Sequence, residues 1–330
     1  MTLSAYLPFF RNHNILSAIP QEPYIWDSVA DASRDNIAVR YSLLPYWVSL
    51  SGSSRLTHQC LTFRNGRVLS IKYTLFADAS RYGTPPIKAL FYEFPDEPKL
   101  FVVDKQFMIG SALLVTPVLY PNATTVRGLP PVFHSLLTLN ATTGHFPSMG
   151  SVVWRDFFTH ERLSNPTQTQ TLEVPLGKIG LHIRSGTAVT LYKDPGYTIA
   201  STRRSDLALL VSLSPGTDGN ARGKVYLDDG ESLPPTPYLE VEVFAEGGRH
   251  GGKIRFVSEG TYVSQPRLQK VVILVNDAYD EQEAGSDITE VWVRGEAWKF
   301  WSWDEKLGEL VIERLEIEVN ELSLGTIGWK

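Results

Sequence analysis

From about residue 96 onward the chain alternates short apolar runs with turn signals, and this spacing most limits its possible folds. In the run 314–319, Leu315, Ile317 and Val319 alternate with charged residues, which predicts a strand with one buried face. Signals such as the Asp-Gly pair at 229–230 predict turns between the runs. Short strands at this spacing indicate β-sandwiches rather than a parallel sheet. Further strands are expected at 106–118, 152–158, 181–184, 207–213, 224–227, 239–244, 271–275 and 291–293.

The first 95 residues predict a mixture of loops and helices. A helix is expected over 28–44, because Ser28 and Asp31 offer a side-chain acceptor to the free N–H groups at its start. Pro45 ends or kinks this helix. Its apolar positions share one face, formed by Ala30, Ile37, Tyr41 and Leu44. The apolar run 88–95 closes on a proline, and an extended segment is expected there.

The composition of the chain limits the classes of partner that it can bind. The 330 residues carry a net charge of -5 and no basic block, which argues against nucleic acid as the main partner. Eight Trp and fourteen Tyr suit a protein that handles carbohydrate, but they suit sandwich cores equally well, and core packing is favoured for most of them. The single cysteine, Cys60, excludes an internal disulfide and a thiolate zinc site.

The signals for export and membrane insertion are few. The N-terminal residues lack a charged region followed by a long apolar run, so no signal peptide is expected in this chain. No segment is apolar enough over a sufficient length to span a membrane. Asn122 and Asn140 begin N-glycosylation sequons, which agree with secretion without showing it.

Several polar clusters favour structural roles. Asp228 and Asp229 are adjacent and would point to opposite faces of a strand, so their carboxylates would not converge on one reacting group. They are therefore rejected as catalytic. Residues 154–156 are expected to alternate between core and surface. His160 beside Glu161 lacks a third ligand at metal spacing, and no Gly-rich phosphate loop occurs, so neither a metal nor a cofactor is expected.

Residues 6–14 have the sequence Tyr-Leu-Pro-Phe-Phe-Arg-Asn-His-Asn. This resembles the aromatic-Pro-Phe-x-Arg-Asn-His-Asn motif near the end of the catalytic barrel of glycoside hydrolase family 31, the α-glucosidase family. The resemblance implies that His13 contacts the sugar at the cleavage point. Arg11 either pairs with a carboxylate of the site or braces the loop that presents His13, and bracing is favoured. Phe9 and Phe10 either line a sugar subsite or pack in a core.

The resemblance continues in order through 40–46, 83–96, 104–119, 153–161 and 226–232. It implies a mainly β fold, with C-terminal β-sandwich domains preceded by an incomplete remnant of a (β/α)8 barrel. Residues 1–95 would be the end of the barrel, 96–200 the proximal β-sandwich and 201–330 the distal one. In the family both catalytic carboxylates precede these motifs, so no catalytic residue is expected in this chain.

The same resemblance implies a secreted, retaining α-glucosidase that hydrolyses terminal α-linked glucose from α-glucoside oligosaccharides. A fragment without the carboxylates is expected to be inactive alone. The alternative function is a non-catalytic β-sandwich module that binds carbohydrate or another protein, and it would need an exposed aromatic platform on one face.

Residues 48–72 match nothing in the family. They open with Val48-Ser49, which a GTAAGT splice donor would encode, and Ile71-Lys72 can end in an acceptor-like AG. A retained intron is favoured over a genuine surface insertion, and a translated intron is expected to pack poorly. A second, weaker excess lies near 127–144.

The barrel remnant is expected to be the weak part of the chain. Its helix over 28–44 would have evolved to cover barrel strands, so the apolar face of that helix must stay exposed or find another partner. The β-domains from about residue 96 carry their own cores. Proteolysis is therefore expected to remove residues 1–90 first.

Overall fold

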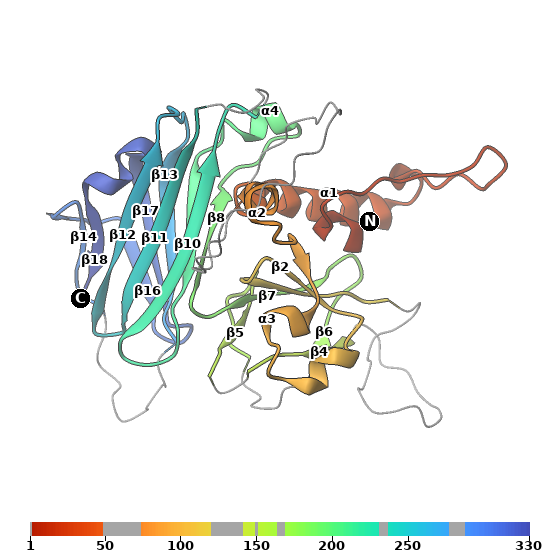
Figure 1. The fold of residues 1–330 in the computed structure, drawn as a ribbon, viewed down its shortest axis with the longest axis horizontal. Coiled ribbons are helices and arrows are strands. Elements are labelled where there is room, and N and C mark those ends of the chain that lie inside the picture. The colour runs from red at the N-terminus through yellow and green to blue at the C-terminus, as the bar shows by residue number, and fades with distance from the viewer. Residues whose placement is uncertain are drawn as a thin grey trace.

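The computed structural model describes residues 2–48, 74–119, 141–148, 151–163, 169–230, 237–276 and 288–330. It is mainly β, as expected, with helices gathered in the N-terminal part (Figure 1). A large sheet of residues 187–329 stands to one side, and a smaller sheet lies below the helices α1 (Asp27–Ser42) and α2 (Thr74–Tyr82). Within the described ranges, no helix combines the length and the apolarity that a membrane crossing requires.

The large sheet has 11 strands in the order β15-β14-β18-β12-β11-β10-β8-β9-β13-β17-β16. Neighbouring strands pair antiparallel except β8 with β10 and β9 with β13, which are parallel. The strands are β8 (Thr187–Tyr192), β9 (Leu207–Ser212), β10 (Gly219–Leu227), β11 (Leu239–Gly248), β12 (Gly251–Gly260), β13 (Arg267–Leu274), β14 (Val291–Val293), β15 (Glu296–Ala297), β16 (Trp301–Asp304), β17 (Glu309–Glu318) and β18 (Thr326–Trp329).

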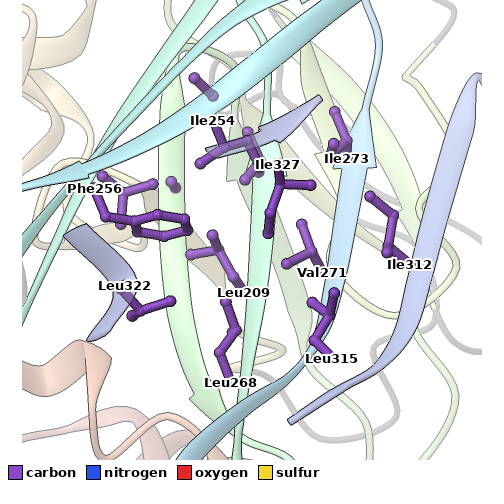
Figure 2. Packing of buried hydrophobic residues seen from close by; sticks show 14 of the residues in the cluster. Leu209, Ile254, Phe256, Leu268, Val271, Ile273, Ile312, Leu315, Leu322 and Ile327 are labelled. Atoms are coloured by element: carbon purple, nitrogen blue, oxygen red, sulfur yellow. The ribbon is translucent and has the colours of Figure 1, made fainter. Parts of the chain in front are cut away.

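This sheet folds over one apolar core. Figure 2 shows Ile254 of β12 and Ile327 of β18 gathered with Leu209 of β9 and Val271 of β13, although these strands lie far apart in the sheet order. All four side chains are at most 2% exposed. Burying each of them stabilises the fold by about 1.5–3 kcal/mol, so this core holds the curled sheet together.

The smaller sheet has five antiparallel strands in the order β1-β2-β3-β7-β5. They are β1 (Ile87–Lys88), β2 (Phe107–Ile109), β3 (Leu113–Thr116), β5 (Trp154–Asp156) and β7 (Gly180–Arg184), and a separate ribbon pairs β4 (Ala141–His145) with β6 (Thr169–Glu173). Trp154 is fully buried beside Phe146, and its indole N–H donates to the Pro147 carbonyl at 2.9 Å. The buried indole is therefore both packed and paired.

The N-terminal helices are built into the body of the protein. The 3-10 helix η3 (Tyr46–Val48) packs against α2, where the Phe76 ring stacks on Trp47 with centroids 6.4 Å apart. Tyr46 is fully buried, donates its hydroxyl to the Ile109 carbonyl at 2.6 Å and accepts the Ala112 N–H at 3.1 Å. The remaining short helices are η1 (Leu3–Tyr6), η2 (Pro23–Ile25), α3 (Leu90–Glu93), η4 (Pro98–Val102), α4 (Ile199–Thr202) and η6 (Val319–Leu324).

The expected helix over 28–44 exists as α1, but its details differ. It begins at Asp27, with Trp26 at the cap position and no side-chain capping bond, so Ser28 is not the cap. Its buried residues are the polar Ser33 and Asn36. The Asn36 amide donates to the carbonyl of Gly177 at 2.8 Å. This hydrogen bond offsets the free-energy cost of burying the polar amide.

Of the apolar face expected on this helix, Leu44 is buried in a core cluster and Tyr41 packs against that cluster, so this part of the face found another partner. Leu43, Leu44, Tyr46 and Trp47 are all less than 9% exposed. Leu43, Tyr46 and Trp47 belong to a core cluster that includes residues of both sheets, such as Leu181. The described helical residues therefore fill the space between the two sheets.

The structure also corrects three local predictions, those for the run 88–95, the turn at 229–230 and Arg155. The run 88–95 is not extended, because it contains the short helix α3, whose Leu90 is fully buried. Asp229 and Gly230 do not form a two-residue hairpin, because β10 and β11 are joined by the longer connection 228–238. Arg155 is not a surface residue but is only 3% exposed. The alternation over 314–319 is confirmed, with Leu315, Ile317 and Val319 buried.

The strand predictions are confirmed near 152–158, 181–184, 207–213, 224–227, 239–244, 271–275 and 291–293, and the run 106–118 holds two strands, β2 and β3. The strands missed are β1, β4, β6, β8, β12, β15, β16 and β18. β8 precedes the expected boundary at 200/201, yet it pairs with β9 and β10 of the large sheet. The chain therefore leaves the smaller sheet after β7, at residues 185–186.

Two expected features lie outside the described residues. These are the segment 49–72 with Cys60, and the two sequons at Asn122 and Asn140. The expected excess at 127–144 is described only from residue 141 onward.

Candidate functional site

Residues 9–26 form an extended arm that projects from the helical end of the molecule (Figure 1). Most of this N-terminal arm is exposed, including large apolar side chains: Phe9, Ile15, Leu16, Ile19, Tyr24, Ile25 and Trp26. Leu16 has its full surface exposed, at 106% of the reference value. Large exposed apolar side chains gathered on one segment are typical of a surface that other protein covers.

Amide side chains tie the two limbs of the arm together. Asn12 donates to the carbonyl of Gln21 at 2.8 Å, and Asn14 donates to the carbonyl of Ile19 at 2.6 Å. In return, the Gln21 amide donates to the carbonyl of His13 at 2.5 Å. These bonds cross the arm on either side of His13, so they fix the backbone from which its imidazole projects.

The base of the arm is held by Arg40 of α1. Its guanidinium donates to the carbonyls of Ala5 at 2.7 Å, Leu7 at 2.5 Å and Pro8 at 2.9 Å. It also lies over the Phe10 ring, 5.0 Å from the ring centroid. Charge-assisted bonds to three carbonyls in one short stretch make Arg40 the anchor between the arm and the core.

The structure places the predicted site residues on one exposed loop. Arg11 and His13 are exposed, and Phe9 is 78% exposed, so core packing of Phe9 is wrong. Phe10 is half-buried against Arg40. The bracing role favoured for Arg11 is performed by Asn12, Asn14, Gln21 and Arg40. Sequence reasoning missed these residues, although both asparagines stand inside the motif itself.

The other polar clusters remain structural. The Asp228 carboxylate accepts the N–H of Gly230 at 2.9 Å, and Gly230 has a φ of 73°, which suits glycine at this turn. The backbone carbonyl of Asp228 accepts a bond from Arg203. Among the described residues no group of three His, Cys, Asp or Glu side chains could hold a metal ion.

Limited trypsin digestion is expected to cut after Arg11 well before it cuts after Arg40. Both residues lie in the N-terminal part, but Arg11 is on the exposed arm and Arg40 is in α1 with three carbonyl partners. Cleavage requires local unfolding, which costs little at an exposed loop. Mass spectrometry should detect fragments that begin at Asn12 before any that begin at Tyr41. Equal rates at the two sites would contradict this division between arm and core.

Two sequence profiles match the chain. The profile described as Glycosyl hydrolase family 31 C-terminal domain matches residues 83–189, and the profile described as Glycosyl hydrolases family 31 TIM-barrel domain matches residues 1–50. An alpha-glucosidase of Schizosaccharomyces pombe is 39% identical over 277 residues, which is 83% of this chain and 23% of that protein. An alpha-glucosidase of Aspergillus niger is 35% identical over 276 residues, again 83% and 23%.

Solved structures share the fold over almost the whole chain. A glucosidase II alpha subunit in its alpha3-Glc2-bound form superposes with a TM-score of 0.70 at 24% identity, covering 99% of this chain and 32% of that one. A dextranase of Flavobacterium johnsoniae complexed with glucose gives a TM-score of 0.65 at 18% identity, covering 93% and 33%. The chain thus spans less than a quarter of the two curated relatives, at 23% of each. It belongs to glycoside hydrolase family 31 and corresponds to the end of the family's catalytic barrel together with the β-domains that follow it.

Proposed function

We propose that this chain is the C-terminal part of a retaining α-glucosidase that removes terminal α-linked glucose from oligosaccharides. The observation that carries the proposal is the arm 9–26, which presents the Arg-Asn-His-Asn motif on a braced but exposed loop. The similarity to alpha-glucosidases of two fungi supports this substrate class. In the complete enzyme, His13 would hydrogen-bond the sugar, while carboxylates outside this chain perform the displacement.

The exposed apolar side chains of the arm support the same proposal. Leu16, Ile19 and Tyr24 are each at least 77% exposed. Water-exposed apolar area of this extent is unfavourable, and packing it against the rest of a barrel would recover that free energy. The arm would then be ordered by its neighbours, and His13 would lie inside a site that excludes water.

We expect the purified chain to release no glucose from a nitrophenyl α-glucoside. Both catalytic carboxylates are proposed to lie outside the chain, and binding alone gives only a small acceleration. Release of glucose that follows the chain through purification would contradict the proposal.

A chimera tests whether this chain supports α-glucosidase activity when the rest of the enzyme is supplied. The aligned segment of the Schizosaccharomyces pombe alpha-glucosidase would be replaced by this chain without residues 48–72, and the chimera is expected to hydrolyse the same substrate. His13→Ala should then lower kcat/KM about 100-fold, the usual effect of removing one donor to a charged transition state. The matched control is His250→Ala, which changes an exposed histidine in the turn between β11 and β12.

The outcomes of the chimera experiment are distinct. Equal effects of His13→Ala and His250→Ala would refute the substrate-binding role of His13. A folded but inactive chimera would refute the α-glucosidase assignment.

We also infer that the complete protein is secreted, on the basis of the sequons at Asn122 and Asn140 and the family resemblance. Expression through a yeast secretory pathway should add N-glycans at these positions. Endoglycosidase treatment should reduce the mass of the product, and Asn122→Gln together with Asn140→Gln should remove that change. An unmodified product would count against secretion.

A further inference from the structure

The limbs of the arm are joined by side chains rather than by a ladder of backbone bonds. Between residues 9 and 21, all of which the structure describes, the one backbone-to-backbone hydrogen bond is at the tip, where the Ala18 N–H donates to the Ile15 carbonyl at 3.1 Å. The Asn14 amide joins the limbs next to this turn. Farther from the tip the limbs are joined through Asn12 and Gln21. The shape of the arm around His13 therefore depends on a few amide side chains.

Gln21 connects the opposite limb directly to His13. Its side-chain amide donates to the His13 carbonyl at 2.5 Å, and its own backbone carbonyl accepts the Asn12 amide at 2.8 Å. Because Asn12 and His13 are adjacent, the two bonds close a ring across the arm. A rotation of the His13 peptide unit must break this ring, since the carbonyl that accepts the bond belongs to His13 itself.

The limb that carries Gln21 is stiff. Pro20 fixes its own φ, and Pro23 restricts the residue before it, Glu22, which is extended with a φ of -61° and a ψ of 138°. Pro23 begins η2, where the Ile25 N–H donates to the Glu22 carbonyl at 3.1 Å, and α1 follows after one residue. Gln21 thus stands on a segment positioned by α1, the same helix that anchors the other limb.

We propose that Gln21 is a positioning residue for the α-glucosidase reaction, a role that rests on the function proposed above. Gln21 holds the peptide unit of His13 and through it sets where the imidazole meets the sugar, without contacting the sugar itself. A reacting geometry that is wrong by about 1 Å can lower the rate about 100-fold. The Asn14 bond remains when the Gln21 bond is lost, so a smaller displacement and a partial loss of rate are expected.

Gln21→Met in the chimera tests this role, because methionine keeps the length of the side chain and removes the donor. Its kcat is expected to fall about tenfold while KM changes less than about twofold, since His13 would act mainly on the transition state. Gln265→Met is the matched control, because Gln265 is an exposed glutamine in the connection between β12 and β13. It should leave kcat unaltered. Both side chains are exposed, so neither change should lower the thermal midpoint.

A double-mutant cycle shows whether Gln21 acts through His13. In the His13→Ala chimera, which lacks the imidazole, adding Gln21→Met should change kcat by less than about twofold. A further loss of about tenfold in that background would show that Gln21 acts independently, and it would overturn the proposal.

The order of the His13 backbone can be measured in the chain itself, without any activity. Selective 15N labelling of the seven histidines gives few NMR signals, and His13→Ala identifies the signal from His13. The order parameter of its amide should fall below about 0.6, the level of flexible backbone, in Gln21→Met. It should stay above that level in the wild type and in Gln265→Met. An unchanged order parameter in Gln21→Met would contradict the positioning role.

The two measurements separate this proposal from the function on which it rests. An inactive chimera with Gln21 in place would refute the α-glucosidase assignment and with it the effect on kcat, whereas the NMR comparison would still decide whether Gln21 orders His13. An active chimera whose kcat is the same in Gln21→Met and Gln265→Met would retain the proposed function and refute the role of Gln21.

Discussion

Replacing Arg155 with Met is expected to lower the free energy of unfolding by about 4 kcal/mol, because buried polar partners would be left unpaired. The Arg155 guanidinium donates to the Asn276 side chain at 2.7 Å and to the carbonyls of His160 at 2.8 Å, Leu307 at 2.6 Å and Val275 at 2.6 Å. Arg155 lies on β5 of the smaller sheet, whereas Val275, Asn276 and Leu307 follow strands of the large sheet. One side chain thus joins the two sheets.

Burial explains why the expected loss is large. Arg155 is 3% exposed, and its pKa is lowered by burial to about 10, so it remains charged at pH 7. Arg155→Lys should recover only a minor part of the loss, because an ammonium cannot reproduce the planar fork that reaches all four acceptors.

The measurement is urea unfolding followed by the fluorescence of the eight tryptophans of the chain, among them the neighbouring Trp154. Arg222→Met is the matched control, since Arg222 is an exposed arginine on β10 and should change stability by less than 0.5 kcal/mol or so. A loss below about 1 kcal/mol for Arg155→Met would show that the two sheets do not depend on this residue.

Lys224→Met is expected to destabilise the chain by about 3–5 kcal/mol, the usual cost of leaving a buried charge without its partner. Lys224 of β10 pairs with Asp78 of α2 at 2.9 Å and lies 3.5 Å from Glu240. The side chains of Lys224 and Asp78 are 2% and 5% exposed. Without the ammonium, the buried Asp78 carboxylate would lose its partner, whereas Glu240 would keep Arg81 at 3.1 Å.

A double variant separates the cost of burial from the benefit of pairing. Asp78→Leu combined with Lys224→Met replaces the ion pair with apolar side chains and should recover most of the stability lost in Lys224→Met. Burial raises the pKa of Asp78, opposed by Lys224, which indicates that desolvation weighs against the charged pair. Additive losses in a double-mutant cycle, measured by urea unfolding, would contradict a direct Asp78–Lys224 coupling.

Further contacts beside the Asp78–Lys224 ion pair attach α2 to the large sheet. Arg81 of α2 bonds to Glu240 at 3.1 Å and lies over the rings of Tyr226 and Tyr238, at 5.0 and 5.1 Å from their centroids. These contacts join α2 to β10 and to the start of β11. Helix α2 is consequently held by the large sheet.

The sequence by itself determined the local features of this protein. Alternation at Leu315, Ile317 and Val319 predicts a half-buried strand because neighbouring side chains on a strand must point to opposite faces. The ordered motifs, beginning with the one around His13, indicate the family because their order along the chain is readable directly. The glycine pairs 247–248 and 251–252, which flank the turn between β11 and β12, can likewise be recognised from adjacent residues.

Only the tertiary structure decided which polar residues are buried and what they join. Arg155 meets Val275 and Leu307, which lie 120 and 152 positions away, so no local pattern could distinguish it from a surface arginine. The same holds for Asn36, whose amide donates to the Gly177 carbonyl 141 positions away. Burial and pairing depend on neighbours brought together by folding, whereas alternation and motif order depend on adjacent residues alone.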